Sequence, residues 1–324
     1  MAFTSMPSGC VLSNRRRCWL TARLVVLPAL YLSVRIAMHA GLQCMPNADA
    51  VGDGFHVFPV LNQLAFTPEV SPWLMFDYAA PKEFGPAKGK RRGVGQHPHR
   101  GFETVTIAFQ GEVEHADSVG NRDVIGPGDV QWMTAGRGIV HEEFHSDRFS
   151  EAGGTFEMAQ LWLNLPAKDK MTKPRYQPIL AKDIPEVELS GGNAVRLIAG
   201  EYGGKNGPAR LHSPVELFDI QLKTKGEAAH IALPEGHNAI VFVRKGEVLV
   251  GEEGKERVLG PQATALMGRE GSLRLVGSEK NSQVLLLAGE PTNEPIAAQG
   301  PMVMNTQEQL RKAFDDFYSG KFGR

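Results

Sequence analysis

The chain has 324 residues, more than one hydrophobic core of usual size needs, so two domains are expected. Apolar residues make up 42 % and charged residues 22 %, which is ordinary for a soluble globular protein. With a formal net charge of −1, the chain has no overall positive field that would attract nucleic acid or anionic membranes. We therefore expect neither as a direct partner.

Residues 1–48 differ from the rest of the chain, because they hold all three cysteines and five arginines but no acidic residue. The apolar stretch LVVLPALYLSV (24–34) is too short to span a membrane. Three interpretations stay open: a signal-peptide core, an arginine-rich transit segment, or an upstream stretch before a true start at Met45. No cysteine follows Cys44, so the body, expected in the cytoplasm, has neither disulfides nor thiolate ligands.

From about residue 50 the sequence consists of short β-like runs separated by Gly, Pro, Asp and Asn. The 36 glycines and 21 prolines favour many tight turns and an all-β fold. The strongest runs lie at 103–109, 120–136, 159–165, 194–200, 215–222, 239–251 and 282–289. Many short strands with regular turn punctuation predict a sandwich or small barrels.

One segment, 305–320, predicts a helix. Thr306 is an N-cap candidate with Gln309 three residues later, which is the capping-box spacing. An apolar face follows, and Gly320 ends the pattern. We expect this helix to pack against the protein at the chain end.

Two short motifs carry candidate metal ligands. In HPHRGFETV, His97 and His99 point to the same side of an extended chain, since side chains alternate faces. In GIVHEEFH, His141 and Glu143 have the same spacing on a later strand. If the two strands pair, three imidazoles and one carboxylate surround one point. This donor set suits Fe(II) with water in the open positions, and also accepts Mn, Co, Ni, Cu or Zn.

Glu103 is an alternative carboxylate ligand. It shares strand parity with His97 and His99 but lies roughly 13 Å beyond His99 along a regular strand. It reaches the metal only if the chain bends at Arg100 and Gly101. Glu143 needs no such bend, so we favour Glu143 as the ligand and Glu103 as a partner that orients an imidazole.

An internal repeat indicates two related β-barrels in tandem. QGEV and, further on, IGP in the first half recur as KGEV and LGP in the second half. The second-half counterparts of His97, His99, Glu103, His141 and Glu143 are Ala232, Pro234, Asn238, Leu275 and Gly277. None of these is a usual metal ligand, so the site is expected in the first barrel alone.

Other residues are weaker candidates for the pocket. Arg100 and Arg137 flank the ligand motifs, where they would bind an anionic or phenolic substrate or simply form ion pairs. Trp132 and Met133 would line the pocket or belong to the core. The remaining histidines without partners at ligand spacing are expected at the surface or in hydrogen bonds: His115, His145, His212, His230 and His237.

The motifs HPHRGFETVTIAFQGEVEHADSVGN, GPGDVQWMTAGRGIVHEE and QLWLNLPAKDKMTKPRYQ closely resemble the pirins, a branch of the bicupin superfamily. The similarity spans 51–306 and excludes residues 1–48. It implies two jelly-roll-like cupin barrels and a non-haem iron in the first barrel. The ligands implied are His97, His99, His141 and Glu143, the four that spacing selects.

The resemblance leaves three alternative functions open. The leading one is a metal-dependent dioxygenase of the quercetin 2,3-dioxygenase type, which uses O2 on flavonol-like or other small phenolic substrates, with Glu143 as general base. The alternative is a non-enzymatic, iron-dependent redox sensor that binds a partner protein. A cupin acting on another small metabolite is a third.

The expected domain boundaries follow from the repeat and the resemblance. Residues 1–48 form an extension that we expect to be disordered, and 49–180 form the metal-binding cupin domain. Residues 181–290 form a cupin domain without metal ligands, and 291–324 form a tail with the helix.

Overall fold

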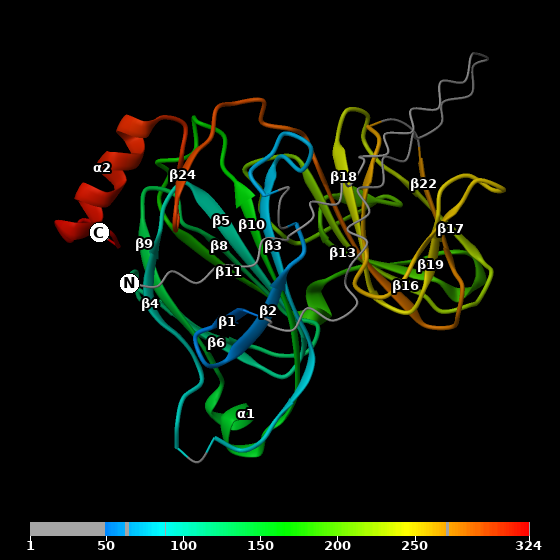
Figure 1. Ribbon diagram of the computed structural model, residues 1–324, viewed down its shortest axis with the longest axis horizontal. Helices are drawn as coiled ribbons and strands as arrows, with labels where there is room; N and C mark the ends of the chain where they lie inside the picture. Colours follow the sequence, from blue (N-terminus) through cyan, green and yellow to red (C-terminus); the bar gives the residue numbers. More distant parts are fainter. Residues whose placement is uncertain (1–48, 62–64, 88, 270–271, 324) are drawn as a thin grey trace, which may run out of the picture. The chain divides into compact units, whose positions relative to one another are not determined.

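The computed structural model describes residues 49–61, 65–87, 89–269 and 272–323. The expectations for the N-terminal extension therefore lie outside the described residues. The described chain is all-β with two α-helices, which confirms the prediction of two tandem β-barrels with a C-terminal helix (Figure 1). Among the described residues, no helix is long and apolar enough to cross a membrane.

The first barrel is built from two sheets. The seven-stranded sheet has the order β1-β2-β3-β10-β5-β8-β11, and the four-stranded sheet has the order β4-β9-β6-β7. Their elements are β1 (Asp49–Val51), β2 (Phe55–Pro59), β3 (Trp73–Phe84), β4 (Gly93–His99), β5 (Phe102–Gln110), β6 (Val113–Asp117), β7 (Arg122–Ile125), β8 (Val130–Thr134), β9 (Ile139–His145), α1 (Asp147–Ala152), β10 (Gly154–Asn164) and β11 (Arg175–Ile179).

The second barrel repeats this plan. A six-stranded sheet, β12-β13-β16-β23-β18-β21, faces a four-stranded sheet, β17-β22-β19-β20, across an apolar core. Its elements are η2 (Ala181–Asp183), β12 (Glu186–Glu188), η3 (Ser190–Gly192), β13 (Ala194–Ala199), β14 (Glu201–Tyr202), β15 (Lys205–Asn206), β16 (Val215–Leu222), β17 (Ala228–Ala232), β18 (Asn238–Lys245), β19 (Val248–Val250), β20 (Arg257–Leu259), β21 (Thr264–Met267), β22 (Ser272–Gly277) and β23 (Ser282–Gly289).

The large sheets of the two barrels share one buried apolar cluster. Phe76 and Tyr78 of β3 contact Phe242 of β18, with ring centroids 4.9 and 5.0 Å apart. Each large sheet is therefore buried on both faces, and this explains why its strands appear as nearly continuous apolar runs in the sequence.

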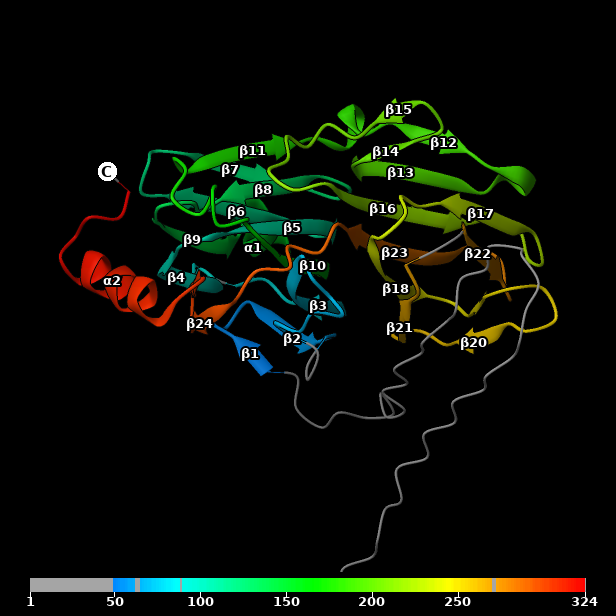
Figure 2. The ribbon, with the colours of Figure 1, turned by 90° about the horizontal axis from the view of Figure 1, so that it is seen from above.

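The C-terminal tail returns to the first barrel. Strands β24 (Ala297–Gln299) and β25 (Met302–Met304) pair with each other, and Met302 bridges to Arg100. Helix α2 (Gln307–Tyr318), red in Figures 1 and 2, lies beside β24, and its buried face packs with Val140 of β9. The capping box at Thr306 is present as predicted.

Candidate metal centre

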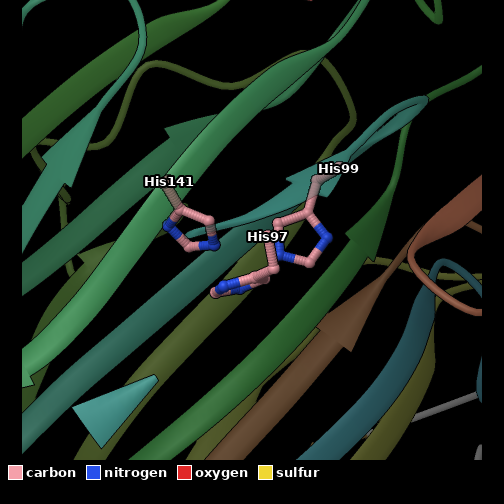
Figure 3. Close-up of side chains that lie close together, drawn as sticks. All are labelled: His97, His99 and His141. Atoms are coloured by element: carbon pink, nitrogen blue, oxygen red, sulfur yellow. The ribbon is translucent and has the colours of Figure 1, made fainter. Parts of the chain in front are cut away.

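Three histidines from two paired strands form a compact cluster. Strands β4 and β9 pair antiparallel with His97 opposite His141, and His99 lies on the same face of β4 as His97. The ring centroid of His141 lies 4.2 Å from that of His97 and 4.8 Å from that of His99 (Figure 3). One ligand atom from each histidine lies within 4.8 Å of the others, and in the described ranges no other such group of three occurs.

Burial favours the neutral form of two of the three imidazoles. Burial lowers the pKa of His99 and of His141 well below the ordinary histidine value, and neighbouring imidazoles lower both further. His97 donates its Nδ1 proton to the carbonyl of Gly95 at 2.9 Å, so Nε2 is the ring nitrogen left for a metal. Neutral imidazole is the form that binds metals.

Two ring nitrogens in this cluster are buried without a hydrogen-bond partner, Nδ1 of His99 and Nε2 of His141. A buried polar atom without a partner costs free energy, and such an atom in a native structure calls for an explanation. A divalent first-row metal ion would satisfy both nitrogens, and three neutral imidazoles are an ordinary donor set for such an ion. The residues present therefore fit a metal.

Glu143 lies outside the three-histidine group but lines the same cavity as His97 and His99. Its Oε1 accepts hydrogen bonds from the hydroxyl of Thr106 at 3.1 Å and from the amide of Gln131 at 2.8 Å. Both donors are uncharged, so they fix the carboxylate in place without neutralising it. The carboxylate is thus held in the wall of the cavity that His97 and His99 also line.

The cavity beside the cluster has a volume of 380 Å³, within the range of small-molecule sites. Its walls are mainly apolar, and three of its polar groups are Asp77, Gln160 and Glu143. Its apolar lining residues are Val51, Phe55, Val57, Met75, Val94, Met158, Trp162 and Pro301. Such walls suit a largely apolar, aromatic ligand.

Glu103 lies on the other face of its strand. The chain turns at Gly101, whose φ is +87° and where a Cβ would lie 1.9 Å from the carbonyl oxygen of Val303. Strand β5 therefore starts in a different sheet from β4, and the strand parity of Glu103 with the histidines is lost. Its carboxyl accepts a hydrogen bond from Thr134 at 2.5 Å, on the face where Val105 enters the core between the barrels.

This position corrects the expectation that Glu103 orients an imidazole. Burial raises the pKa of the Glu103 carboxyl to about 7. Glu103 is a buried carboxyl group of the core between the barrels and does not contribute to the histidine cluster.

The flanking arginines lie away from the cavity wall. The buried guanidinium of Arg100 forms an ion pair with Asp316 of α2 at 2.9 Å, and its Nε donates to the carbonyl of Arg137 at 2.6 Å. Its guanidinium also lies 4.5 Å from the ring centroid of Phe322. Arg137 is exposed. A substrate-binding role for Arg100 is therefore replaced by a structural role in holding α2.

Trp132 and Met133 are both buried on β8 and are not lining residues of this cavity. Trp132 belongs to the apolar cluster between the barrels, and Met133 packs with Ile139. This placement agrees with the interpretation that Trp132 and Met133 belong to the core, and not with the interpretation that they line the pocket.

Two further functional candidates, His115 and Asp117, were not predicted from the sequence. Both side chains are completely buried on β6, the strand next to β9. The His115 ring lies against that of His141, with Nδ1 atoms 3.4 Å apart, and its Nε2 lies 3.1 Å from Asp117 Oδ2. The H-x-D spacing at 115–117 was the available signal, since it places both side chains on one face of a strand.

The other histidines have local roles. His145 donates to the carbonyl of Gly54 at 2.9 Å, and His237 is hydrogen-bonded to Glu216 at 2.8 Å. His230 is exposed.

Comparison with known proteins identifies relatives over most of the chain. The family model described as Pirin matches residues 54–163, and the Pirin C-terminal cupin domain matches residues 217–323. A Pseudomonas aeruginosa protein with the provisional name quercetin 2,3-dioxygenase is 48 % identical over 285 residues, which are 88 % of this chain and 98 % of that protein. Human pirin is 34 % identical over 256 residues, which are 78 % of this chain and 83 % of human pirin.

Solved structures show the same architecture. A crystal structure of quercetin 2,3-dioxygenase from Acinetobacter baumannii matches with a TM-score of 0.79 and 45 % identity, covering 91 % of this chain and 97 % of that one. A protein from Geobacillus kaustophilus matches with a TM-score of 0.63 and 30 % identity, covering 82 % of this chain and 95 % of that one.

Proposed function

The chain belongs to the pirin family, and we propose that it is a metal-dependent dioxygenase of the quercetin 2,3-dioxygenase type, acting on flavonol-like phenols with O2. One observation carries this proposal: three histidines form a compact cluster, and two of them, His97 and His99, line an apolar cavity that also contains the carboxylate of Glu143. The names of two relatives, from Pseudomonas aeruginosa and Acinetobacter baumannii, support the choice of substrate class.

We assign the metal to His97, His99, His141 and Glu143, with Fe(II) as the ion. Three nitrogens and one oxygen suit Fe(II), although the same set accepts other divalent first-row ions. When bound, the metal supplies a Lewis acid that makes a phenolic or enolic hydroxyl more acidic.

Glu143 is assigned as the general base. Both of its hydrogen bonds, from Thr106 and Gln131, end on Oε1. Oε2 is therefore the atom that we assign to take the proton from the flavonol hydroxyl. Thr106 and Gln131 keep the carboxylate oriented while it does so, since neither can supply a competing charge.

The cavity walls hold the aromatic body of the substrate. Trp162 packs against His99, with ring centroids 5.5 Å apart, so a planar ligand beside the imidazoles would contact an aromatic surface. Met75 and Met158 add adaptable apolar surface. Together these side chains exclude water from the reacting hydroxyl.

The cavity supports the enzyme over the regulator. A non-enzymatic redox sensor that binds a partner protein needs the metal but no occupiable apolar space beside it. The cavity of 380 Å³ reaches His97, which is only partly buried, so a small molecule has access to the cluster. This access favours the enzyme.

The test is an aerobic and an anaerobic assay of the Fe(II)-loaded full chain with quercetin. The proposal expects flavonol consumption with release of CO in the aerobic assay alone. Wild-type protein that holds its metal and consumes no flavonol would reject the activity.

Two matched variants separate the role of Glu143 from that of the scaffold. Glu143→Gln keeps the shape of the side chain and removes the base, and it is expected to lower kcat about 100-fold or more. Glu142→Gln alters the neighbouring carboxylate, which lies near Arg122 at 3.7 Å, and is expected to retain activity. Equal activity in the two variants would contradict the assignment of Glu143.

A further inference from the structure

We propose that Asp117 and His115 form a hydrogen-bond relay that fixes the tautomer of His141, so that Nε2 of His141 is presented to the metal. This inference rests on the metal site of the proposed function. It assigns a positioning role to two buried residues of β6 that do not themselves contact the cavity.

The relay starts at the carboxylate of Asp117, which can only accept hydrogen bonds in its present surroundings. Oδ1 accepts from the backbone N–H groups of Val119 and Asn121, each at 3.0 Å. Oδ2 accepts from the side-chain amide of Asn121 at 2.8 Å and faces Nε2 of His115 at 3.1 Å. With four donors around two oxygens, the carboxylate requires a proton on Nε2 of His115.

The next step passes from His115 to His141. A neutral His115 with its proton on Nε2 has a lone pair on Nδ1, and this atom faces Nδ1 of His141 at 3.4 Å. Nδ1 of His141 must then carry the proton, because two lone pairs facing each other would repel. The ring of His115 is held in this orientation by stacking on Tyr176, with centroids 4.6 Å apart and planes at 19°.

The far end of the relay is the atom that needs a partner. Nε2 of His141 is buried without a hydrogen bond, and in this tautomer it has a lone pair directed away from His115. The same relay explains why Nε2 is left without a partner, because the proton of His141 is used on the opposite side of the ring. A hydrogen-bond partner on the far side of a ligating histidine, as His115 is here, typically raises metal affinity about 10- to 100-fold.

The first measurement reads the tautomer directly, without metal or substrate. Long-range ¹H–¹⁵N spectra of the chelator-treated full chain, labelled with ¹⁵N-histidine, distinguish Nδ1–H from Nε2–H. The His141 signals are assigned by their absence from His141→Gln. The wild-type protein is expected to show Nδ1–H on His141.

Two variants interrupt the relay at different links. His115→Phe keeps an aromatic ring against Tyr176 but removes both ring nitrogens. Asp117→Asn keeps the size of the side chain but adds an amide donor, so Nε2 of His115 is no longer required to carry a proton. Both variants are expected to show a mixed or Nε2–H tautomer of His141.

The second measurement is the affinity for Co²⁺ alone, followed by its visible absorption. Both variants are expected to bind Co²⁺ about 10- to 100-fold more weakly than wild type. The control is His237→Phe, which removes a buried histidine hydrogen-bonded to a carboxylate, Glu216, in the second barrel. It should change neither the tautomer nor the affinity.

Either of two results would overturn the relay: Nε2–H on His141 in the wild-type protein, or Nδ1–H retained in both variants. Because the tautomer is read without metal and without quercetin, failure of the dioxygenase assay would leave this result intact. Loss of the relay would in turn leave the dioxygenase proposal standing.

Discussion

His97 and His141 occupy directly opposite positions in the antiparallel pair β4–β9, and their ring centroids lie 4.2 Å apart. The two residues belong to different motifs, separated by four further strands of the same barrel. Strand pairing, rather than proximity in the sequence, therefore brings the imidazoles together. The rigid sheet presents them without a loop that would have to become ordered when a metal binds.

Metal binding should stabilise the folded chain through this cluster. At a free Co²⁺ concentration 100-fold above Kd, binding to the native state adds about 2.7 kcal/mol to the free energy of unfolding. The increase is measured by urea denaturation with Co²⁺ and with a chelator. His141→Gln should abolish it, whereas His230→Gln, which alters an exposed histidine, should keep it. An equal increase in both variants would contradict a site at His141.

Glu103 should make stability fall as the pH rises. Burial raises its pKa to about 7 in the folded chain, from 4.5 when unfolded, so the folded state holds the proton more tightly. The resulting stabilisation is complete below pH 4.5 and is lost as the pH rises through 7. The full effect is about 3 kcal/mol.

Glu103→Gln removes this titration and keeps a group that can accept from Thr134. Its free energy of unfolding, measured by urea denaturation between pH 5 and pH 8, is expected to fall less than that of wild type. Parallel profiles would show that the Glu103 carboxyl titrates normally. Co²⁺ affinity serves as the control and should be unchanged, because Glu103 lies on the other face of β5 from Thr106, which contacts Glu143.

The contrast between Glu103 and the histidines shows what the sequence can predict. Alternation along a strand gives the face of each side chain, and it places His97 beside His99 and His141 on the same side as Glu143. The regularly spaced turn residues and the internal repeat likewise predict the two barrels, and the capping box at Thr306 predicts the helix.

Alternation of side chains along one strand does not predict to which sheet the next strand belongs. The turn at Gly101 transfers the chain from one sheet to the other, which removes Glu103 from the cluster. The partnership of His115 with His141 depends on β6 lying beside β9, and the ion pair of Arg100 depends on the return of the tail. Both are long-range pairings without a local sequence signal.

Lys170 should be essential for attaching the tail. Its buried ammonium donates to the carbonyl of Gly101 at 2.8 Å, to Asn164 Oδ1 at 2.7 Å and to the carbonyl of Val303 at 3.0 Å. Lys170→Met leaves these acceptors without a donor and should lower the free energy of unfolding by about 3 kcal/mol. Urea denaturation measures the loss. Lys168→Met, at an exposed position nearby, should cost under about 0.5 kcal/mol, and equal losses would argue against the role of Lys170.

The buried ion pair between Arg100 and Asp316 should hold helix α2 on the barrel. Hydrogen bonds from Lys321 and Arg100 keep the pKa of Asp316 well below its usual range, so the carboxylate is charged and strongly bound. Asp316→Ala leaves the Arg100 guanidinium buried without its partner and should lower the free energy of unfolding by about 3 kcal/mol. The helix should also become more accessible to proteolysis.

Lys312→Ala is the matched control, since it removes an exposed partner of the same carboxylate, 3.3 Å away. A surface pair of this kind contributes under about 1 kcal/mol, so this variant should stay near wild type. If Asp316→Ala were as stable as Lys312→Ala, the packing of Leu310 and Ala313 alone would hold the helix, and Arg100 would be free for another role. The comparison therefore tests the structural assignment of Arg100 directly, independently of the metal.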